Sequence, residues 1–270
     1  MLFHCMEALG NNFVLIDCVT QKVKTLNNIV ALLKSSEECL DFDQVLAIHP
    51  PKTKEADFDL EIYNLDGSKA ENCVNGLRCV GKYLIEEKIA LCDDITISVM
   101  NKTFKVSKIK DLYSVESDFS LISGDIGLSG KEINLDLDFH KKKVKVFSVS
   151  VGNPHGVIFN DNYDLDVEDF GSFLQKSGIY SKGVNVGFVK VINEKEISLR
   201  VFERGVGETQ ACGSGACAAS IICSLENKTS DEIEVNFYQG SVNTKVDRKR
   251  SKIKLTGDAV YRKRNIETIF

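Results

Sequence analysis

The sequence contains one short pattern twice, as Cys73-Val74-Asn75-Gly76 and again as Cys212-Gly213-Ser214-Gly215. Each copy stands just before an apolar run, residues 77–87 in the first case and 216–225 in the second. The length and composition of these runs are typical of buried helices. The repeated pattern therefore predicts two helices, each of which begins next to a cysteine.

Two weaker matches accompany the cysteine pattern at nearly the same spacing. Gly10-Asn11-Asn12-Phe13 is echoed by Gly152-Asn153-Pro154-His155, and Asn64-Leu65-Asp66-Gly67 by Phe202-Glu203-Arg204-Gly205. Three matches in the same order indicate an internal duplication. We therefore expect two similar domains: residues 1–112 with 258–270, which hold Cys73, and residues 113–257, which hold Cys212.

Both halves also carry several short stretches that alternate in polarity or are rich in β-branched residues, as half-buried strands are. These stretches are residues 13–19, 58–63, 95–100, 103–107, 144–151, 184–192, 197–202, 233–237 and 252–255. Many strands around one long apolar helix, twice over, predict an α/β (α+β) fold in which each helix packs into a curled sheet.

Composition narrows the class of protein. The chain has 270 residues, 43% hydrophobic and 27% charged residues and a net charge of −5 that is spread along the sequence, so we expect a globular protein without a nucleic-acid surface. The N-terminus does not resemble a secretory signal, and no apolar stretch is long enough for a transmembrane helix. Nine cysteines without the spacing of a disulfide framework favour a reducing cytoplasm.

A cysteine at a helix start has a specific chemistry. The unpaired N–H groups and the helix dipole there lower a thiol pKa from about 8.5 to between roughly 3.5 and 7.5. The same N–H groups can bind a carboxylate. Two such starts that face one another suit proton removal from one face of a carbon next to a carboxylate and proton return to the other. Cys73 and Cys212 are therefore candidates for the acid and base of a racemase or epimerase.

The other cysteines have a simpler interpretation, because a lone cysteine usually packs as a small hydrophobe. We expect this of Cys5, Cys18, Cys39, Cys79, Cys92, Cys217 and Cys223. A metal site is not predicted, because the spacings that include Cys73 and Cys212 do not fit a zinc site and no histidine pair accompanies them.

The two cysteine segments resemble the signatures of the diaminopimelate epimerase family. The first runs from Asn64 to Cys79 and the second from Glu203 to Gly215, and further similarities extend the resemblance from about residue 3 to residue 260. The resemblance implies two pseudo-symmetric domains, each a curled, mainly antiparallel sheet around a central helix. It also implies interconversion of LL- and meso-2,6-diaminopimelate for lysine and peptidoglycan precursors, without pyridoxal phosphate or another cofactor.

The resemblance also implies roles for individual residues. Cys73 and Cys212 match the catalytic thiols, and His155 and Glu203 match positions that modulate the pKa of these thiols. Backbone N–H groups of Val74, Asn75, Gly213 and Ser214 would hold the reacting carboxylate. The residues expected to bind the rest of the substrate are Asn11, Gln44, Asn64, Asn153, Asn185, Glu203 and Arg204.

The sequence departs from the family pattern at a few positions. Val74 stands where the family usually has glycine, and residues 39–42 lack the usual Gly-Ile-Gly turn before Gln44. Lys263 falls where family members use a tyrosine at a dimer contact, so the homodimer that the family implies is less strongly predicted than the active site.

Two other functions fit part of this pattern. One is a racemase of another amino acid, such as a proline- or histidine-type racemase, but such a substrate would not need Asn64, Asn153, Asn185 and Arg204. The other is a non-catalytic redox switch in which Cys73 and Cys212 form a disulfide. No sequence feature indicates the partner that such a switch would need.

Overall fold

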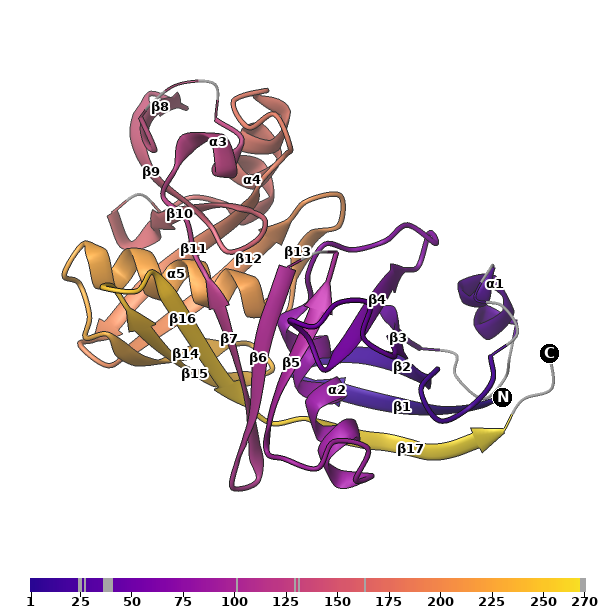
Figure 1. Ribbon diagram of the computed structural model, residues 1–270. Helices are drawn as coiled ribbons and strands as arrows, with labels where there is room; N and C mark the ends of the chain where they lie inside the picture. The colour runs from indigo at the N-terminus through magenta and orange to yellow at the C-terminus, as the bar shows by residue number, and fades with distance from the viewer. Residues whose placement is uncertain are drawn as a thin grey trace. The chain divides into compact units, whose positions relative to one another are not determined.

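The structure is a computed structural model that describes residues 1–23, 26, 28–35, 41–100, 102–128, 130, 132–162 and 164–267. It divides into two compact units (Figure 1). Unit 1 comprises Met1–Glu116 and Thr256–Phe270, and unit 2 comprises Ser117–Leu255. The internal repeat placed the corresponding boundaries near residues 112 and 257.

Unit 1 combines a long sheet with two helices that connect its strands. The helices are α1 (Ile29–Lys34) and α2 (Val74–Glu86). The strands are β1 (Leu2–Ala8), β2 (Asn11–Asp17), β3 (Gln44–His49), β4 (Phe58–Asn64), β5 (Asp94–Val99), β6 (Lys102–Ile109), β7 (Leu112–Asp118) and β17 (Val260–Glu267). They pair in the order β17–β1–β2–β3–β4–β5–β6–β7. The pairs β2–β3 and β4–β5 are parallel, because α1 and α2 lie on the connections between them, and the other pairs are antiparallel.

Unit 2 repeats this plan. Its helices are α3 (Ser123–Ile126), the 3-10 turn η1 (Asn160–Asn162), α4 (Val167–Lys176) and α5 (Gly213–Leu225). Its strands are β8 (Asn134–Phe139), β9 (Lys142–Ser150), β10 (Pro154–Phe159), β11 (Asn185–Asn193), β12 (Glu196–Glu203), β13 (Gly207–Thr209), β14 (Glu232–Phe237), β15 (Gly240–Asp247) and β16 (Lys252–Gly257). They pair as β8–β9–β10–β11–β12–β14–β15, and β13 also pairs with β12.

The two pairing orders correspond strand for strand. Counting from β17 in unit 1 and β8 in unit 2, the pairs run antiparallel, antiparallel, parallel, antiparallel, parallel and antiparallel in both. In each unit the second parallel crossover contains the helix that follows the repeated cysteine. The structure therefore shows the same topology in both halves, beyond the three short sequence matches.

These two crossover helices are the central elements of their units. Helix α2 packs on β1, β2, β3 and β6, and α5 packs on β9, β10, β11, β12, β14 and β15. Nearly all of α5 is buried, because its alanines, serines, cysteines and glycines let strands approach it from several sides. The predicted class, a strand-dominated α/β fold with a central helix, is confirmed.

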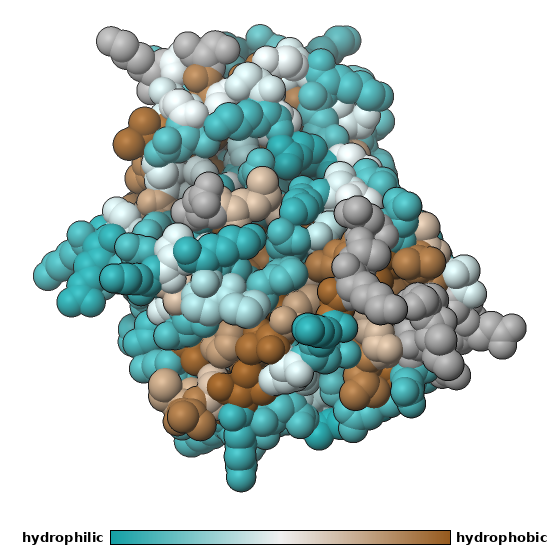
Figure 2. Space-filling view, turned by 45° about the vertical axis from the view of Figure 1, so that its right-hand side comes forward, coloured by the Kyte–Doolittle hydropathy of each residue, from teal (hydrophilic) through white to brown (hydrophobic). Residues whose placement is uncertain are grey.

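The surface carries charged side chains with scattered apolar ones. On the face drawn in Figure 2, apolar residues lie together in the lower half and hydrophilic residues surround them. Large exposed apolar side chains of unit 1 include Leu2 on β1 and Val260 on β17. Among the described residues, no helix combines the length and apolarity that a membrane span requires.

The cysteines outside the repeat only partly follow the prediction. Cys79, Cys217 and Cys223 are buried thiols, as expected of packed side chains. Cys18 is half-buried and packs against the apolar core of unit 1, in agreement with the prediction. Cys92 is exposed, so for this cysteine the prediction of a packed hydrophobe is wrong. Cys5 is disulfide-bonded, which corrects the expectation of a thiol at that position. Cys39 lies outside the described residues.

Candidate active site

Cys73 caps the N-terminus of helix α2. Its backbone is extended, with φ −150° and ψ 97°, and its sulfur accepts a hydrogen bond from the Gly76 N–H at 3.3 Å. The first intrahelical bond, Leu77 N–H to the Cys73 carbonyl, follows at once. The helix therefore begins directly after the cysteine, three residues earlier than the apolar run alone predicts.

Cys212 occupies the same position at the start of helix α5. Its φ of −144° and ψ of 113° match those of Cys73, and its sulfur accepts from the Gly215 N–H at 3.4 Å. Ala216 N–H bonds to the Cys212 carbonyl. Sulfur thus takes the place of the usual Ser, Thr, Asp or Asn oxygen at both helix caps.

Space is tight around the glycine at the third helical position of both helices. A Cβ on Gly76 would lie 2.9 Å from a Leu46 methyl and 3.4 Å from the Cys73 sulfur. A Cβ on Gly215 would lie 3.0 Å from a Val201 methyl and 3.4 Å from the Cys212 sulfur. The missing side chains let each sulfur sit close over its first helical turn.

The surroundings of Cys212 favour its protonated form. The side chain is only 6% exposed, and burial together with the nearby Glu203 carboxylate raises the pKa of this thiol well above its usual range. Bonds from Ser214 and the Gly215 N–H act in the opposite direction but are weaker. The helix-start argument predicted a lowered pKa, and for Cys212 that prediction is wrong because desolvation outweighs the helix amides.

Glu203 connects Cys212 to a neighbouring strand. Its Oε2 accepts the Cys212 S–H at 3.3 Å, and its Oε1 accepts the Thr209 hydroxyl at 2.6 Å. The Ser214 hydroxyl lies 3.4 Å from the same sulfur. Glu203 ends β12, and Thr209 comes from β13, which pairs with it. Thr209 therefore fixes the carboxylate with one oxygen directed at the thiol.

His155 is buried on β10, where its Nε2 lies 3.1 Å from Asn153 Oδ1. Burial, with a smaller contribution from the Arg204 charge, lowers the pKa of His155 to about 3. The imidazole is therefore neutral at pH 7 and at mildly acidic pH. Its Nδ1 is buried without a hydrogen-bond partner among the described residues.

Asn11 and Asn75 meet beside Cys73. Asn75, in the first turn of α2, donates from Nδ2 to Asn11 Oδ1 at 2.7 Å. Arg78, one turn along the helix and 0% exposed, donates from Nη2 to Asn75 Oδ1 at 2.7 Å and from Nη1 to the Asp258 carbonyl at 2.8 Å. The sequence indicated the two asparagines but not Arg78.

The remaining predicted residues form two further pairs. Gln44 and Asn64 lie opposite one another on β3 and β4, and Gln44 Nε2 donates to Asn64 Oδ1 at 2.9 Å. Asn185, at the start of β11, accepts the Arg204 N–H at 2.8 Å. The Arg204 guanidinium bonds to the Lys182 carbonyl. Val74 is buried in the first turn of α2. Its backbone N–H, rather than its side chain, is the group that the sequence analysis assigns to the reacting carboxylate.

The repeat relates several of these residues to one another. Phe13, Gln44 and Asn64 share one register row across β2, β3 and β4. His155 and Asn185 share the corresponding row across β10 and β11, and Glu203 follows in the same register on β12. Each unit thus places polar side chains at the same strand ends, next to its cysteine helix.

Thr209 and Arg78 are the site residues that the sequence did not reveal. Both lie within the quoted signatures, but a threonine in a short strand and an arginine in an apolar helix have no diagnostic spacing. Within the described residues, His, Cys, Asp and Glu side chains do not gather in groups of three or more that could hold a metal ion.

Solved structures with the same fold include an epimerase and a phenazine biosynthesis protein. A hydroxyproline epimerase from Agrobacterium vitis, solved with bound trans-4-hydroxy-L-proline, matches with a TM-score of 0.71 and 12% identity over 97% of this chain and 90% of its own. A PhzF-family phenazine biosynthesis protein from Bacillus anthracis matches with a TM-score of 0.66 and 15% identity over 100% and 99%. At this identity the likeness establishes the fold, which epimerases share with other enzymes.

The family follows from the sequence comparisons. The family model for diaminopimelate epimerase matches residues 3–115 and 147–262. The diaminopimelate epimerase of Psychrobacter cryohalolentis is 35% identical over 252 residues, which are 89% of this chain and 85% of the relative. That of Psychrobacter sp. PRwf-1 is 36% identical over 252 residues, with the same coverage. The chain belongs to the diaminopimelate epimerase family and is an isomerase of the epimerase type.

Proposed function

We propose that this enzyme interconverts LL- and meso-2,6-diaminopimelate by proton transfer at Cα between Cys73 and Cys212. The observation that supports this most directly is the matched placement of the two thiols, each the N-cap of the central helix of its unit. Inversion needs a base on one face of the carbon and an acid on the other. The proposal requires the two sulfurs to approach opposite faces of one bound carbon.

Cys212 enters the reaction as the acid. Its burial and the Glu203 carboxylate keep the thiol protonated. A thiolate at Cys73 takes the Cα proton, the electron pair of the C–H bond stays on the carbon and is delocalised into the carboxylate, and the Cys212 proton completes the inverted centre. The reverse direction exchanges the two roles, and proton exchange with solvent resets the pair.

The first helical turns would hold the reacting carboxylate. The caps use the N–H groups of Gly76 and Gly215, so the N–H groups proposed for the carboxylate are those just before them, at Val74, Asn75, Gly213 and Ser214. The helix dipoles favour an anion there, and the charge that develops in the transition state is stabilised in the same place. No pyridoxal phosphate or metal is needed for this chemistry.

Polar residues at the strand ends would bind the distal, unreacted end of the substrate. We assign this role to Asn11, Gln44, Asn64, Asn153, Asn185, Glu203 and Arg204. Arg204 suits a carboxylate because a guanidinium can bind it through two parallel hydrogen bonds. A substrate with a second amino-acid head uses such a set, whereas proline or histidine would leave it without partners.

We propose that the reaction serves lysine and peptidoglycan precursor synthesis, as the family resemblance implies, and that the enzyme works in the cytoplasm. We also propose the homodimer that the family implies, with β17 and its exposed Val260 at the contact, although Lys263 on this strand replaces the tyrosine that family members use there. Sedimentation equilibrium tests this part separately. A chain that remains monomeric at micromolar concentration would contradict the dimer and leave the chemistry unaffected.

Deuterium wash-in tests the proposed function. LL-diaminopimelate is incubated with the enzyme in D₂O, and the label at Cα and the ratio of isomers are followed by NMR and chiral chromatography, with proline and histidine as alternative substrates. We expect label and inversion with diaminopimelate and neither with the other amino acids. Wash-in with proline or histidine alone would reassign the enzyme to another racemase activity.

A further inference from the structure

The buried Arg78 lies where it can fix the orientation of the Asn75 side-chain amide and, through it, that of Asn11. Its side chain is 0% exposed inside unit 1, although an arginine rarely occurs in such a position without a specific role. It donates to Asn75 Oδ1 at 2.7 Å, and Asn75 in turn donates to Asn11 Oδ1 at 2.7 Å. Arg78 also donates to the Asp258 carbonyl, just before β17, at 2.8 Å, and it lies 3.8 Å from the Asp258 carboxylate.

The direction of these hydrogen bonds follows from the chemistry of arginine. A guanidinium has donors and no acceptor, so it must face the oxygen of the Asn75 amide. The Asn75 NH₂ group then points to Asn11, which must present its own oxygen in return. The Asn11 oxygen is thereby occupied, and the part of the amide left for a ligand is its NH₂ group, a donor. Without Arg78, both amides could rotate by 180° at little cost.

We propose that Arg78 is a positioning residue that, through Asn75, holds the Asn11 amide as an N–H donor toward a substrate carboxylate. This inference rests on the proposed function for the identity of the substrate. Arg78 does not itself touch the substrate, and its effect on binding passes through the two asparagines.

Unit 2 contains a comparable arrangement at the matching position. Asn153 is the repeat counterpart of Asn11, and its Oδ1 faces His155 Nε2 at 3.1 Å. Because burial and the Arg204 charge keep His155 neutral, the ring has a single N–H, and it donates that N–H to Asn153. In both units, therefore, a buried donor occupies the asparagine oxygen and leaves its NH₂ group directed elsewhere.

Steady-state kinetics with Arg78→Lys, Asn11→Ala and the double variant test this relay of hydrogen bonds from Arg78 through Asn75 to Asn11. Lysine keeps the positive charge but is a point donor that cannot hold both Asn75 and the Asp258 carbonyl in the arginine's geometry. We expect KM to rise about tenfold with Arg78→Lys while kcat changes much less, since the lost bond is one of substrate binding. In the Asn11→Ala background, Arg78→Lys should have no further effect on KM.

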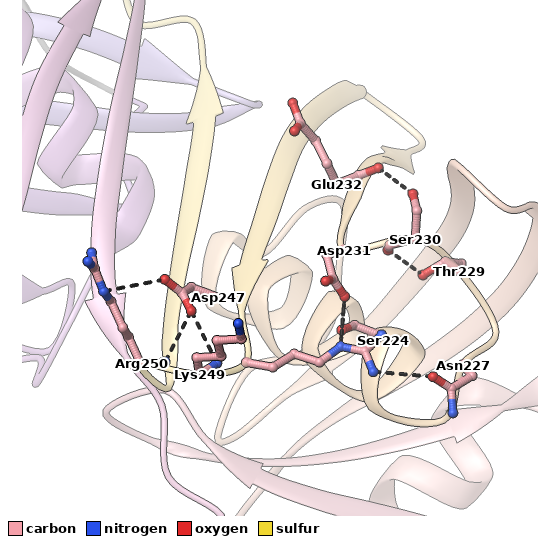
Figure 3. Close-up of polar contacts among 10 residues, drawn as sticks. Ser224, Asn227, Thr229, Ser230, Asp231, Glu232, Asp247, Lys249 and Arg250 are labelled. Carbon is pink, nitrogen blue, oxygen red and sulfur yellow. Dashed lines mark hydrogen bonds and ion pairs between the residues drawn. The ribbon is translucent and has the colours of Figure 1, made fainter.

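Arg248→Gln is the matched control, because Arg248 anchors the far end of the other central helix. It donates to Ser224 at 2.8 Å and to Asp231 at 2.7 Å. Figure 3 shows Ser224, Asp231 and Asn227 near the end of α5. Arg248→Gln should lower the thermal midpoint without a tenfold change in KM. If Arg78→Lys behaves like this control, or if its effect on KM adds to that of Asn11→Ala, the positioning role is wrong.

A measurement without substrate separates this inference from the proposed function. The side-chain NH₂ resonances of ¹⁵N-labelled protein are recorded, and the signal of Asn11 is identified by its loss in Asn11→Ala. Arg78→Lys should shift the Asn11 signal and leave that of Asn227 in place. An unmoved Asn11 signal would overturn the relay whatever the substrate of the enzyme, whereas a shifted signal in a protein inactive on diaminopimelate would count only against the proposed function.

Discussion

The Cys212 thiol donates to the Glu203 carboxylate at 3.3 Å, and the same carboxylate holds the Thr209 hydroxyl at 2.6 Å. A negative charge so close to a sulfur opposes the loss of the thiol proton. The proposed acid of the reaction is therefore kept protonated by its neighbour from strand β12, in addition to its burial.

Glu203→Gln should lower the pKa of Cys212, because the amide removes the negative charge while burial stays. The measurement is the pH dependence of Cys212 alkylation by iodoacetamide in a Cys73→Ser background, followed by mass spectrometry. We expect the midpoint to move to lower pH. Glu208→Gln serves as the control, since Glu208 pairs with Arg200 and does not contact the sulfur. An unchanged or higher midpoint for Glu203→Gln would contradict the role of the carboxylate.

Cys73→Ser and Cys212→Ser should each remove epimerisation while the fold persists. A serine hydroxyl is too weakly acidic to replace the thiol in proton transfer, so turnover should fall by a factor of about 10²–10⁴ or more. Serine is also a favourable N-cap, so the thermal midpoint should stay or rise slightly. Normal turnover by either variant would refute the two-base mechanism. Wash-in of deuterium without inversion, in one of the two, would identify the surviving base.

Gly171→Ala should destabilise unit 2. A Cβ at this position of α4 would lie 2.4 to 2.7 Å from three atoms of Phe202, one of them its Cβ, so the helix must move away from β12. Overpacking of this kind costs about 1–3 kcal/mol. Phe202 precedes Glu203, so activity should fall as well.

Gly124→Ala, in α3, is the matched substitution, because nothing lies within 4 Å of its added Cβ. Its free energy of unfolding in urea should stay within about 0.5 kcal/mol of the wild-type value. Equal effects of the two substitutions would show that α4 does not pack on β12 as described.

His155 should make the protein sensitive to acid. Its pKa is about 3 in the folded state and 6.5 in the unfolded chain, so the unfolded chain binds the proton more readily. Above pH 6.5 His155 is neutral in both states and does not lower the free energy of unfolding. As the pH falls from 6.5 toward 3, only the unfolded chain takes up the proton, and the free energy of unfolding decreases. Between pH 7 and pH 4.5 the loss amounts to roughly 2.5 kcal/mol. Urea titrations of wild type and His155→Gln at both pH values should differ by about this amount, and parallel pH profiles would contradict a buried neutral imidazole.

Much of the fold could be predicted because its signals are local. The repeated cysteine stretch gave the position of both central helices, and β-branched alternation gave strands such as β6 and β12. Helix α4 was not predicted, although Asp166 is a good N-cap and Val167, Phe170 and Leu174 follow at helical spacing. Strand pairing could not be predicted, because register depends on contacts between residues far apart in the chain.

The site was harder to predict than the fold wherever burial decides the chemistry. The helix-start argument located both thiols but gave the wrong direction for the pKa of Cys212, since sequence does not show how much water a side chain loses. Burial was also missed for Arg78, because an arginine in an apolar helix is expected at the surface unless its hydrogen-bond partners are known. The polar pairs, such as Gln44 with Asn64, depend on the register between strands.

Each sulfur accepts a hydrogen bond from the amide of the third residue of its own helix, Gly76 in α2 and Gly215 in α5. A thiolate accepts such a bond more strongly than a thiol does, and an alkylated sulfur more weakly. Glycine amides resonate in a sparsely populated region of a ¹H–¹⁵N spectrum. These two signals therefore serve as natural reporters of protonation, one for each half of the chain, and allow the resting state of each cysteine to be followed without a label on the sulfur.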